Sequence, residues 1–159
     1  MSLAHLLAGT NILVSGGTQG VGAAVARAAA AQGAAGIAVS GRSIEAGESL
    51  ARELTDAGTP ARFIRTDLAS VAEAEASVTG TIDRFRRLDH VVNAAGLTTR
   101  GTVLDTDQDL FDAHIAGNLR APFFIMQETI SHLKGRSAGG SIVNIVTMSE
   151  HGGQPCLAP

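Results

Sequence analysis

The residues best suited to binding chemistry near the start of the chain are three glycines, Gly16, Gly20 and Gly22. They follow the apolar run 12–14, which is typical of a short buried strand. Because glycine lacks a Cβ, this turn can adopt positive φ angles and let an anionic ligand reach the backbone. The helix expected after it presents free N–H groups and a positive dipole end. The segment therefore predicts a pyrophosphate site, with a ligand-free tight turn as the alternative.

The end of the second expected strand, 36–40, is followed by a cation and no carboxylate. Arg42 lies just after it, and no Asp or Glu occupies positions 40–43. In a doubly wound nucleotide fold, an acidic side chain here bonds the ribose hydroxyls of NAD, whereas an arginine accommodates the 2′-phosphate of NADP. The charge at this position favours NADP, with NAD as the second choice. A solvated surface arginine is the alternative interpretation.

A long helix is expected over 107–134, and one residue disturbs it. Thr106, with Asp109 three residues later, resembles a capping box at the start of this helix. Pro122 has no N–H, so the carbonyl of Asn118 loses its helical partner and the helix is bent or loosened there. A carbonyl freed in this way needs another donor, usually water.

Several of these segments together resemble the short-chain dehydrogenase/reductase family: the G-x-x-x-G-x-G turn, the segment Asn93-Ala94-Ala95-Gly96 and the pair Asn118-Leu119. The resemblance implies that Asn93 ties the central sheet together and that Ala94 to Gly96 line a cofactor cleft. It also places Asp67 beside the adenine, where the start of a turn or a helix cap is a compatible role. The cofactor-binding residues expected on these grounds are Gly16, Thr18, Gln19, Gly20, Val21, Gly22, Arg42, Ser43, Asp67, Leu68, Asn93, Ala94 and Gly96.

The same resemblance implies catalytic roles for Asn118 and Thr147. Asn118 matches the residue that holds a water in the proton relay of the family. Thr147 aligns with the catalytic serine that hydrogen-bonds the substrate carbonyl, and a threonine hydroxyl can donate the same bond. Ser149 is the alternative hydroxyl. The resemblance thus implies NADP(H)-dependent hydride transfer between the cofactor and a small-molecule carbonyl or alcohol substrate.

The general acid of the family does not occur in this sequence. In the family, a tyrosine assisted by a lysine four residues later protonates the developing alkoxide. That pair is expected soon after the segment 152–155, yet the chain has no tyrosine and Lys134 is its single lysine. These residues are therefore expected to be inactive alone and to form the leading part of a longer reductase. A noncatalytic dinucleotide-binding protein or fragment is the alternative, and a methyltransferase comes third.

The expected strands, at 11–14, 36–40, 62–66, 88–92 and 141–147, alternate with expected helices at 20–32, 44–57, 70–87 and 107–134. The predicted fold class is α/β with a doubly wound parallel sheet, a Rossmann fold that is incomplete at the C-terminal side. A length of 159 residues and a hydrophobic content of 45% fit one NAD(P)-binding domain over residues 1–159.

The bulk composition excludes several classes of partner. The formal net charge is −3 without a basic cluster, so nucleic acid is not expected to bind. No apolar run reaches the ~18 residues of a membrane span. The single cysteine, Cys156, cannot form an internal disulfide, which favours a cytoplasmic, reducing compartment. No metal-ligand set is recognisable, and the family resemblance implies a homodimer or homotetramer.

Overall fold

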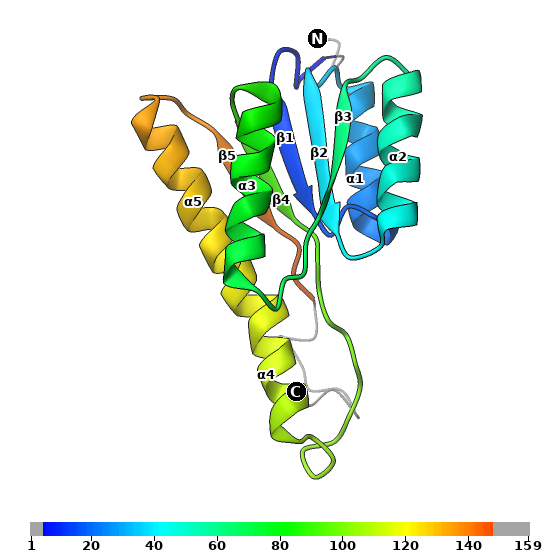
Figure 1. The fold of residues 1–159 in the computed structure, drawn as a ribbon, viewed down its shortest axis with the longest axis vertical. Coiled ribbons are helices and arrows are strands. Elements are labelled where there is room, and N and C mark those ends of the chain that lie inside the picture. The colour runs from blue at the N-terminus through cyan, green and yellow to red at the C-terminus, as the bar shows by residue number, and fades with distance from the viewer. Residues whose placement is uncertain (1–4, 148–159) are drawn as a thin grey trace.

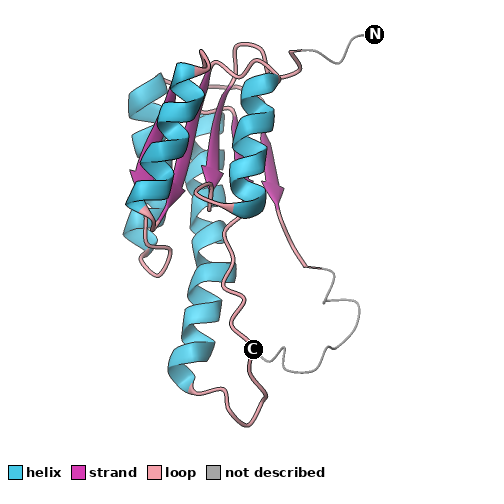
Figure 2. Ribbon diagram, turned by 90° about the vertical axis from the view of Figure 1, so that its right-hand side faces the viewer, coloured by secondary structure: helices cyan, strands magenta, loops and turns pink. Residues whose placement is uncertain are grey.

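The chain forms a parallel sheet of five strands in the order β3-β2-β1-β4-β5, with helices on both faces (Figures 1 and 2). This computed structural model describes residues 5–147. The strands are β1 (Asn11–Ser15), β2 (Gly36–Gly41), β3 (Ala61–Arg65), β4 (His90–Asn93) and β5 (Ser141–Asn144). The helices are α1 (Gly20–Ala31), α2 (Ile44–Asp56), α3 (Val71–Phe85), α4 (Gln108–Ile115), the π-helical η1 (Ala116–Arg120) and α5 (Ala121–Gly135). The predicted doubly wound α/β fold is confirmed.

Two apolar clusters, one on each face of the sheet, form the core. Successive strand residues point to opposite faces, so Ile12 and Val14 of β1 pack in the cluster with α1 and α2, whereas Leu13 packs in the cluster with α3 and α5. Because both faces are covered, the central strands are apolar at almost every position, as expected for a parallel sheet. The alanines Ala23 and Ala26 of α1 are buried, which lets this helix lie close to the sheet.

The strand order reverses direction between β1 and β4, since β2 and β3 extend to one side of β1 and β4 and β5 to the other. Val14 illustrates this central position of β1, because it is in register with Val39 of β2 and with Val92 of β4. In open α/β sheets, ligands bind beyond the carboxyl ends of the strands at such a switch point. The topology therefore indicates where a binding site is to be sought.

The long helix predicted over 107–134 is one continuous helical rod with a π-helical turn in it. In η1, the backbone N–H of Ala121 donates to the carbonyl of Ala116, five residues earlier. Pro122 follows at once, and its ring nitrogen has no hydrogen to give to the carbonyl of Asn118. The predicted loosening at Asn118 is therefore confirmed, in the form of the π-turns that often mark functional sites.

Two boundaries differ from the sequence prediction. Asp107, and not Thr106, caps α4, because its Oδ1 accepts the N–H of Leu110 at 2.8 Å. Strand β5 ends at Asn144 and not at Thr147. Its partner β4 ends at Asn93, whose carbonyl accepts the N–H of Ile145 at 2.9 Å just beyond the paired residues.

A buried carboxylate lies at the amino end of β4, at the edge of the sheet away from the switch point. Asp89 is 5% exposed, and its Oδ2 accepts the backbone N–H of Asn11 and the Nε–H of Arg87, both at 2.8 Å. Burial acts to raise the pKa of Asp89, but the bonds from Arg87 and Asn11 and the charge of Arg136 outweigh it and lower the pKa.

His132 of α5 lies near Asp89 and Arg136. Its Nε2 accepts the N–H of Leu88 at 3.2 Å, which requires a neutral ring. Burial and the neighbouring Arg136 charge lower the pKa of His132. A group whose pKa is lower in the folded chain binds more protons when unfolded, so Asp89 and His132 both make folding less favourable as the pH falls.

Within residues 5–147, none of the helices is long and apolar enough to cross a membrane.

Candidate cofactor-binding site

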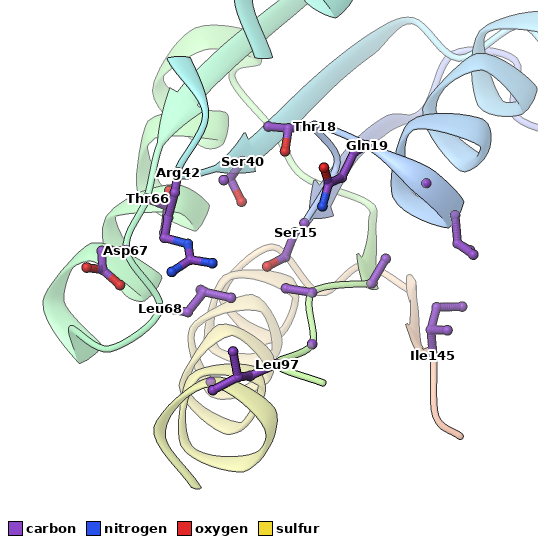
Figure 3. Close-up of a pocket in the computed structure, with 18 of the residues that line it drawn as sticks. Ser15, Thr18, Gln19, Ser40, Arg42, Thr66, Asp67, Leu68, Leu97 and Ile145 are labelled. Atoms are coloured by element: carbon purple, nitrogen blue, oxygen red, sulfur yellow. The ribbon is translucent and has the colours of Figure 1, made fainter. Parts of the chain in front are cut away.

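A cavity of about 400 Å³ lies at the carboxyl ends of β1 to β4, at the predicted switch point (Figure 3). The turns after these four strands line it on one side, and the α4–η1 helix lines it on another. The lining residues are Ser15, Gly16, Thr18, Gln19, Gly20, Val21, Ser40, Gly41, Arg42, Thr66, Asp67, Leu68, Ala69, Ala94, Ala95, Gly96, Leu97, Ala113, Gly117 and Ile145.

The turn after β1 has no room for side chains at two of its glycines. Gly16 has a φ of +76°, and a Cβ there would lie 2.8 Å from the Cβ of Ala95. A Cβ at Gly22, in the first turn of α1, would lie 2.8 Å from the carbonyl carbon of Gly16. Glycine is therefore required for the chain to turn sharply and for α1 to begin against the turn.

The start of α1 is open to an anion. Gln19, the residue before the helix, makes no side-chain capping bond, and the first turn contains no acidic residue. The first N–H groups of a helix have no partners within it, and here Gln19, Gly20 and Val21 line the cavity. Gly22 is buried behind them and is absent from the lining.

Neighbouring strand ends are linked by backbone hydrogen bonds. The carbonyl of Ser40 at the end of β2 accepts the N–H groups of Gly16 and Gly17, at 2.9 and 3.1 Å. The carbonyl of Gly41 accepts the N–H of Thr66 at 2.9 Å. The turns after β1, β2 and β3 are therefore held in one frame around the cavity.

The end of β2 contributes Arg42, the one cationic side chain among the lining residues within 5–147. Figure 3 shows the Arg42 guanidinium directed into the space between Asp67 and Ser15. Among the described residues no ion pair involves Arg42. Ser43, also predicted to bind cofactor, is not among the lining residues and caps α2, where its Oγ accepts the N–H of Ala46 at 3.4 Å.

The turn after β3 places a carboxylate at the cavity. Asp67 and Leu68 line it, as does Ala69. The Oδ1 of Asp67 accepts the N–H of Ala69 at 3.0 Å, a turn that fixes the direction of the carboxylate. The cap of α3 is Ser70, so the start of a turn, and not a helix cap, accompanies the cavity position of Asp67.

The segment after β4 forms the part of the cavity wall next to the glycine turn. Ala94, Ala95 and Gly96 all line it, and the N–H of Ala94 donates to the carbonyl of Ser15 at 2.8 Å. Asn93 is buried in the sheet, where its Nδ2 donates to Oδ1 of Asn144 at 2.8 Å. Asn93 thus joins β4 to β5 and is not one of the lining residues.

The side chain of Asn118 is bonded to the backbone of Leu97, a residue of the cavity wall. Its Oδ1 accepts the N–H of Leu97 at 2.7 Å, and its Nδ2 donates to the carbonyl of the same residue at 3.0 Å. The Nδ1 of His114 lies 3.4 Å from that Nδ2. The amide side chain therefore clamps the chain after β4 to the π-helical turn, and the cavity-facing positions of this helix are Ala113 and Gly117.

Of the two candidate hydroxyls, Thr147 is exposed and does not line the cavity, whereas Ser149 lies outside the described residues. The lining residue nearest to them in sequence is Ile145. The segment 152–155 also lies outside the described part of the chain. No group of three or more His, Cys, Asp or Glu suited to a metal ion occurs within residues 5–147.

The sequence analysis did not predict several of the lining residues, although the positions of some of them in the sequence could have indicated them. Ser15 and Ser40 end neighbouring strands of a parallel sheet, so their carboxyl-end position alone places them at the switch point. Ala113 and Gly117 are small residues four apart, which share one helix face. Leu97 could be found only from the fold, since it depends on the clamp from Asn118.

Comparison with known proteins identifies the family. The family model described as short chain dehydrogenase matches residues 10–159. The chain belongs to the short-chain dehydrogenase family. This family of oxidoreductases was the one that the glycine turn and the segment 93–96 resembled, so that prediction is confirmed.

Two curated relatives show how much of a similar protein is matched. An uncharacterized oxidoreductase from Thermotoga maritima is 33% identical over 137 residues, which are 86% of this chain and 53% of that protein. A 3beta-hydroxysteroid dehydrogenase from Mediterraneibacter gnavus is 32% identical over 148 residues, 92% of this chain and 52% of that protein. The chain thus spans about half the length of the curated relatives it matches.

A solved structure shares the fold of this chain. The crystal structure of a blue fluorescent protein from a metagenomic library in complex with NADPH is 32% identical, with a TM-score of 0.86. The similarity covers 95% of this chain and 61% of that one.

Proposed function

We propose that residues 1–159 form an NAD(P)-binding domain and that the protein is an NADP(H)-dependent oxidoreductase acting on a carbonyl or alcohol. The observation that carries this proposal is the cavity that joins an uncapped, glycine-built helix start to the unpaired Arg42. A dinucleotide phosphate has negative charge at both places, on its pyrophosphate and on its 2′-phosphate. The resemblance to a protein crystallised with NADPH supports the same cofactor.

The residues present fit such a cofactor. The turn from Gly16 to Gly22, from which two side chains are sterically excluded, would hold the pyrophosphate against the first N–H groups of α1. Arg42 would bind the 2′-phosphate, and Asp67 and Leu68 would border the adenine. Ala94 to Gly96, whose side chains are small or absent, would leave space for the rest of the cofactor beside this turn. When bound, the nicotinamide supplies or accepts the hydride.

For the substrate end, we propose that Thr147 donates a hydrogen bond to the carbonyl oxygen, with Ser149 as the alternative donor. Asn118 would contribute by fixing the π-helical turn and, through its backbone, the path of a water in a proton relay. Reduction of a carbonyl also needs a general acid, and the chain has no tyrosine. We therefore propose that these residues bind cofactor without turnover on their own. A noncatalytic dinucleotide-binding protein is the competing function.

Titration with dinucleotides tests the binding site, and a turnover assay separates the two functions. NADPH is expected to bind to the complete polypeptide more tightly than NADH. The fluorescence of the reduced nicotinamide reports the binding of either dinucleotide. The chain itself has no Trp and no Tyr, so its own emission is weak. Failure of both dinucleotides to bind would refute the site. Binding without oxidation of NADPH by any of a panel of ketones and aldehydes would favour the noncatalytic function.

We also propose that the protein self-associates through α4 and α5. Four apolar side chains, each at least 48% exposed, follow one another along this helical rod: Phe111, Leu119, Phe123 and Ile130. An exposed apolar stripe of this kind is typical of an interaction surface. A homodimer or homotetramer, as in the family resemblance, would cover it.

A further inference from the structure

A carboxylate outside the cavity is bonded to the loop that lines it. The Oε2 of Glu73, on α3, accepts the backbone N–H of Asp67 at 2.8 Å and the Nη1–H of Arg65 at 3.0 Å. Asp67 lines the cavity and Glu73 does not. Glu73 therefore acts on the cavity wall through the backbone of another residue.

The position of Glu73 in α3 makes this contact unusual. Ser70 caps the helix by accepting the N–H of Glu73 at 3.3 Å, so these two residues have the spacing of a capping box. In a capping box, the glutamate side chain bonds the N–H of the cap residue itself. Here that N–H donates to the carbonyl of Asp67 at 3.1 Å, and the Glu73 carboxylate reaches further, to the N–H of Asp67.

The bond from Glu73 completes the fixation of this loop. On the side of β2, the N–H of Thr66 is held by the carbonyl of Gly41 at 2.9 Å. Beyond it, the Oδ1 of Asp67 accepts the N–H of Ala69 at 3.0 Å. The peptide between these two anchors, which orients Asp67 toward the cavity, is bonded to Glu73. Without that carboxylate, the N–H of Asp67 loses its charged partner.

We propose that Glu73 is a positioning residue for the adenosine half of the dinucleotide site. This inference rests on the proposed cofactor-binding function. The Glu73 carboxylate stabilises the backbone conformation in which Asp67 and Leu68 face the ligand, and it does so without touching the ligand. Arg65, whose side chain is 56% exposed, neutralises part of its charge but makes no bond to the loop that Glu73 holds.

The test compares ligands that contain the adenosine half with one that lacks it, in the complete polypeptide. NADPH and adenosine 2′,5′-bisphosphate contain it, and reduced nicotinamide mononucleotide does not. Glu73→Ala is expected to weaken the first two roughly five- to tenfold, since a hydrogen bond to a charged group is lost at a partly exposed site. The affinity for the mononucleotide is expected to stay unchanged.

Two further variants separate positioning from simple loss of charge. Glu73→Gln keeps an oxygen that can accept the N–H of Asp67 and is expected to retain most of the affinity for NADPH. Glu53→Ala is the matched control, because Glu53 of α2 forms an exposed ion pair with Arg27 at 2.6 Å outside the cavity lining. It is expected to leave all three affinities unchanged.

The outcomes distinguish the inference from the function on which it rests. If the unmodified protein binds neither NADPH nor NADH, the proposed function fails. If it binds NADPH and Glu73→Ala binds equally well, or loses affinity for all three ligands alike, the positioning role is refuted. Should Glu73→Ala not fold, Glu73→Asp, with a carboxylate one methylene shorter, takes its place with the same expected split between ligands.

Discussion

Replacement of Gly20 by alanine, with Gly58→Ala as its matched control, tests whether the first turn is shaped for a ligand. Gly20 and Gly58 have φ angles of +53° and +95°, and at both an added Cβ meets no heavy atom within 4 Å. Holding a residue with a Cβ in the left-handed region costs about 1–2 kcal/mol. Both substitutions are therefore expected to lower the free energy of unfolding by a similar amount.

The two variants differ in what occupies the open space beside them. Gly20 lines the cavity at the start of α1, whereas Gly58 follows α2 and is not a lining residue. In our proposal the space at Gly20 belongs to the pyrophosphate. A methyl group forced into an occupied, well-packed place costs about 1–3 kcal/mol. This corresponds to a loss of about 5- to 150-fold in affinity for NADPH.

Denaturant unfolding followed by circular dichroism gives the two stabilities, and titration with NADPH gives the two affinities. Gly58→Ala is expected to bind NADPH like the unmodified protein. If Gly20→Ala binds NADPH as tightly as Gly58→Ala does, the helix start does not hold the phosphates. If the two variants differ widely in stability, the shared cost assumed for positive φ is wrong and the comparison must be corrected for it.

Four further predictions concern other residues. Arg42→Asp exchanges a cation for an anion at the proposed 2′-phosphate position and is expected to lower the ratio of NADPH to NADH affinity by about 10- to 100-fold; an unchanged ratio would contradict the role of Arg42. Asp89→Asn is expected to lower the free energy of unfolding by about 1.5–3 kcal/mol at pH 7, because bonds to a charged group are lost. The unmodified fold is expected to lose stability in two stages, from neutral pH downward as His132 takes up a proton on unfolding and below about pH 4 as Asp89 does; Asp89→Asn should flatten the second stage in denaturant titrations. Phe123→Glu on the exposed face of α5 is expected to convert an oligomer to a monomer in light scattering; an unmodified protein that is already monomeric would refute the proposed interface.

The fold was predictable because its elements are encoded locally. Ile12–Val14 and Ile37–Val39 are continuous apolar runs bounded by glycine turns, and a strand covered on both faces needs such a run. The distortion at Asn118 followed from one residue, Pro122, whose missing N–H acts at a fixed distance along the helix. Such features depend on short spacings in the sequence and not on distant contacts.

The features that the sequence did not predict depend on contacts between elements. The end of β5 at Asn144 is set by where its neighbour β4 leaves the sheet, and β5 itself could have continued. Asp107 and Thr106 are both good capping residues, and the path of the preceding loop decides between them. The contact from Glu73 to Asp67 joins a helix to the loop before it, where a capping box within the helix was equally consistent with the residue types.

Most of the residues predicted to bind the cofactor lie just after the ends of strands, and the fold brings these strand ends together. Gly16, Arg42 and Asp67 lie far apart in the sequence and line one cavity, because parallel strands end at the same edge. Ser43 and Asn93 stand beside such strand ends, but their side chains serve a helix cap and a link between strands. Adjacency in sequence to a lining residue is thus a weaker guide to the cavity lining than the direction in which a side chain leaves its strand.

The carbonyl groups of Ser40 and Gly41 connect three loops before any ligand arrives. A ligand would meet these three turns already joined, so they would lose little conformational entropy on association. Encounter and orientation would then limit the association rate, which should depend on ionic strength through the attraction of the anion to the cavity. Because main-chain atoms form these bonds, substitutions of the surrounding side chains can change the ligand preference while the backbone hydrogen bonds between the three loops stay the same.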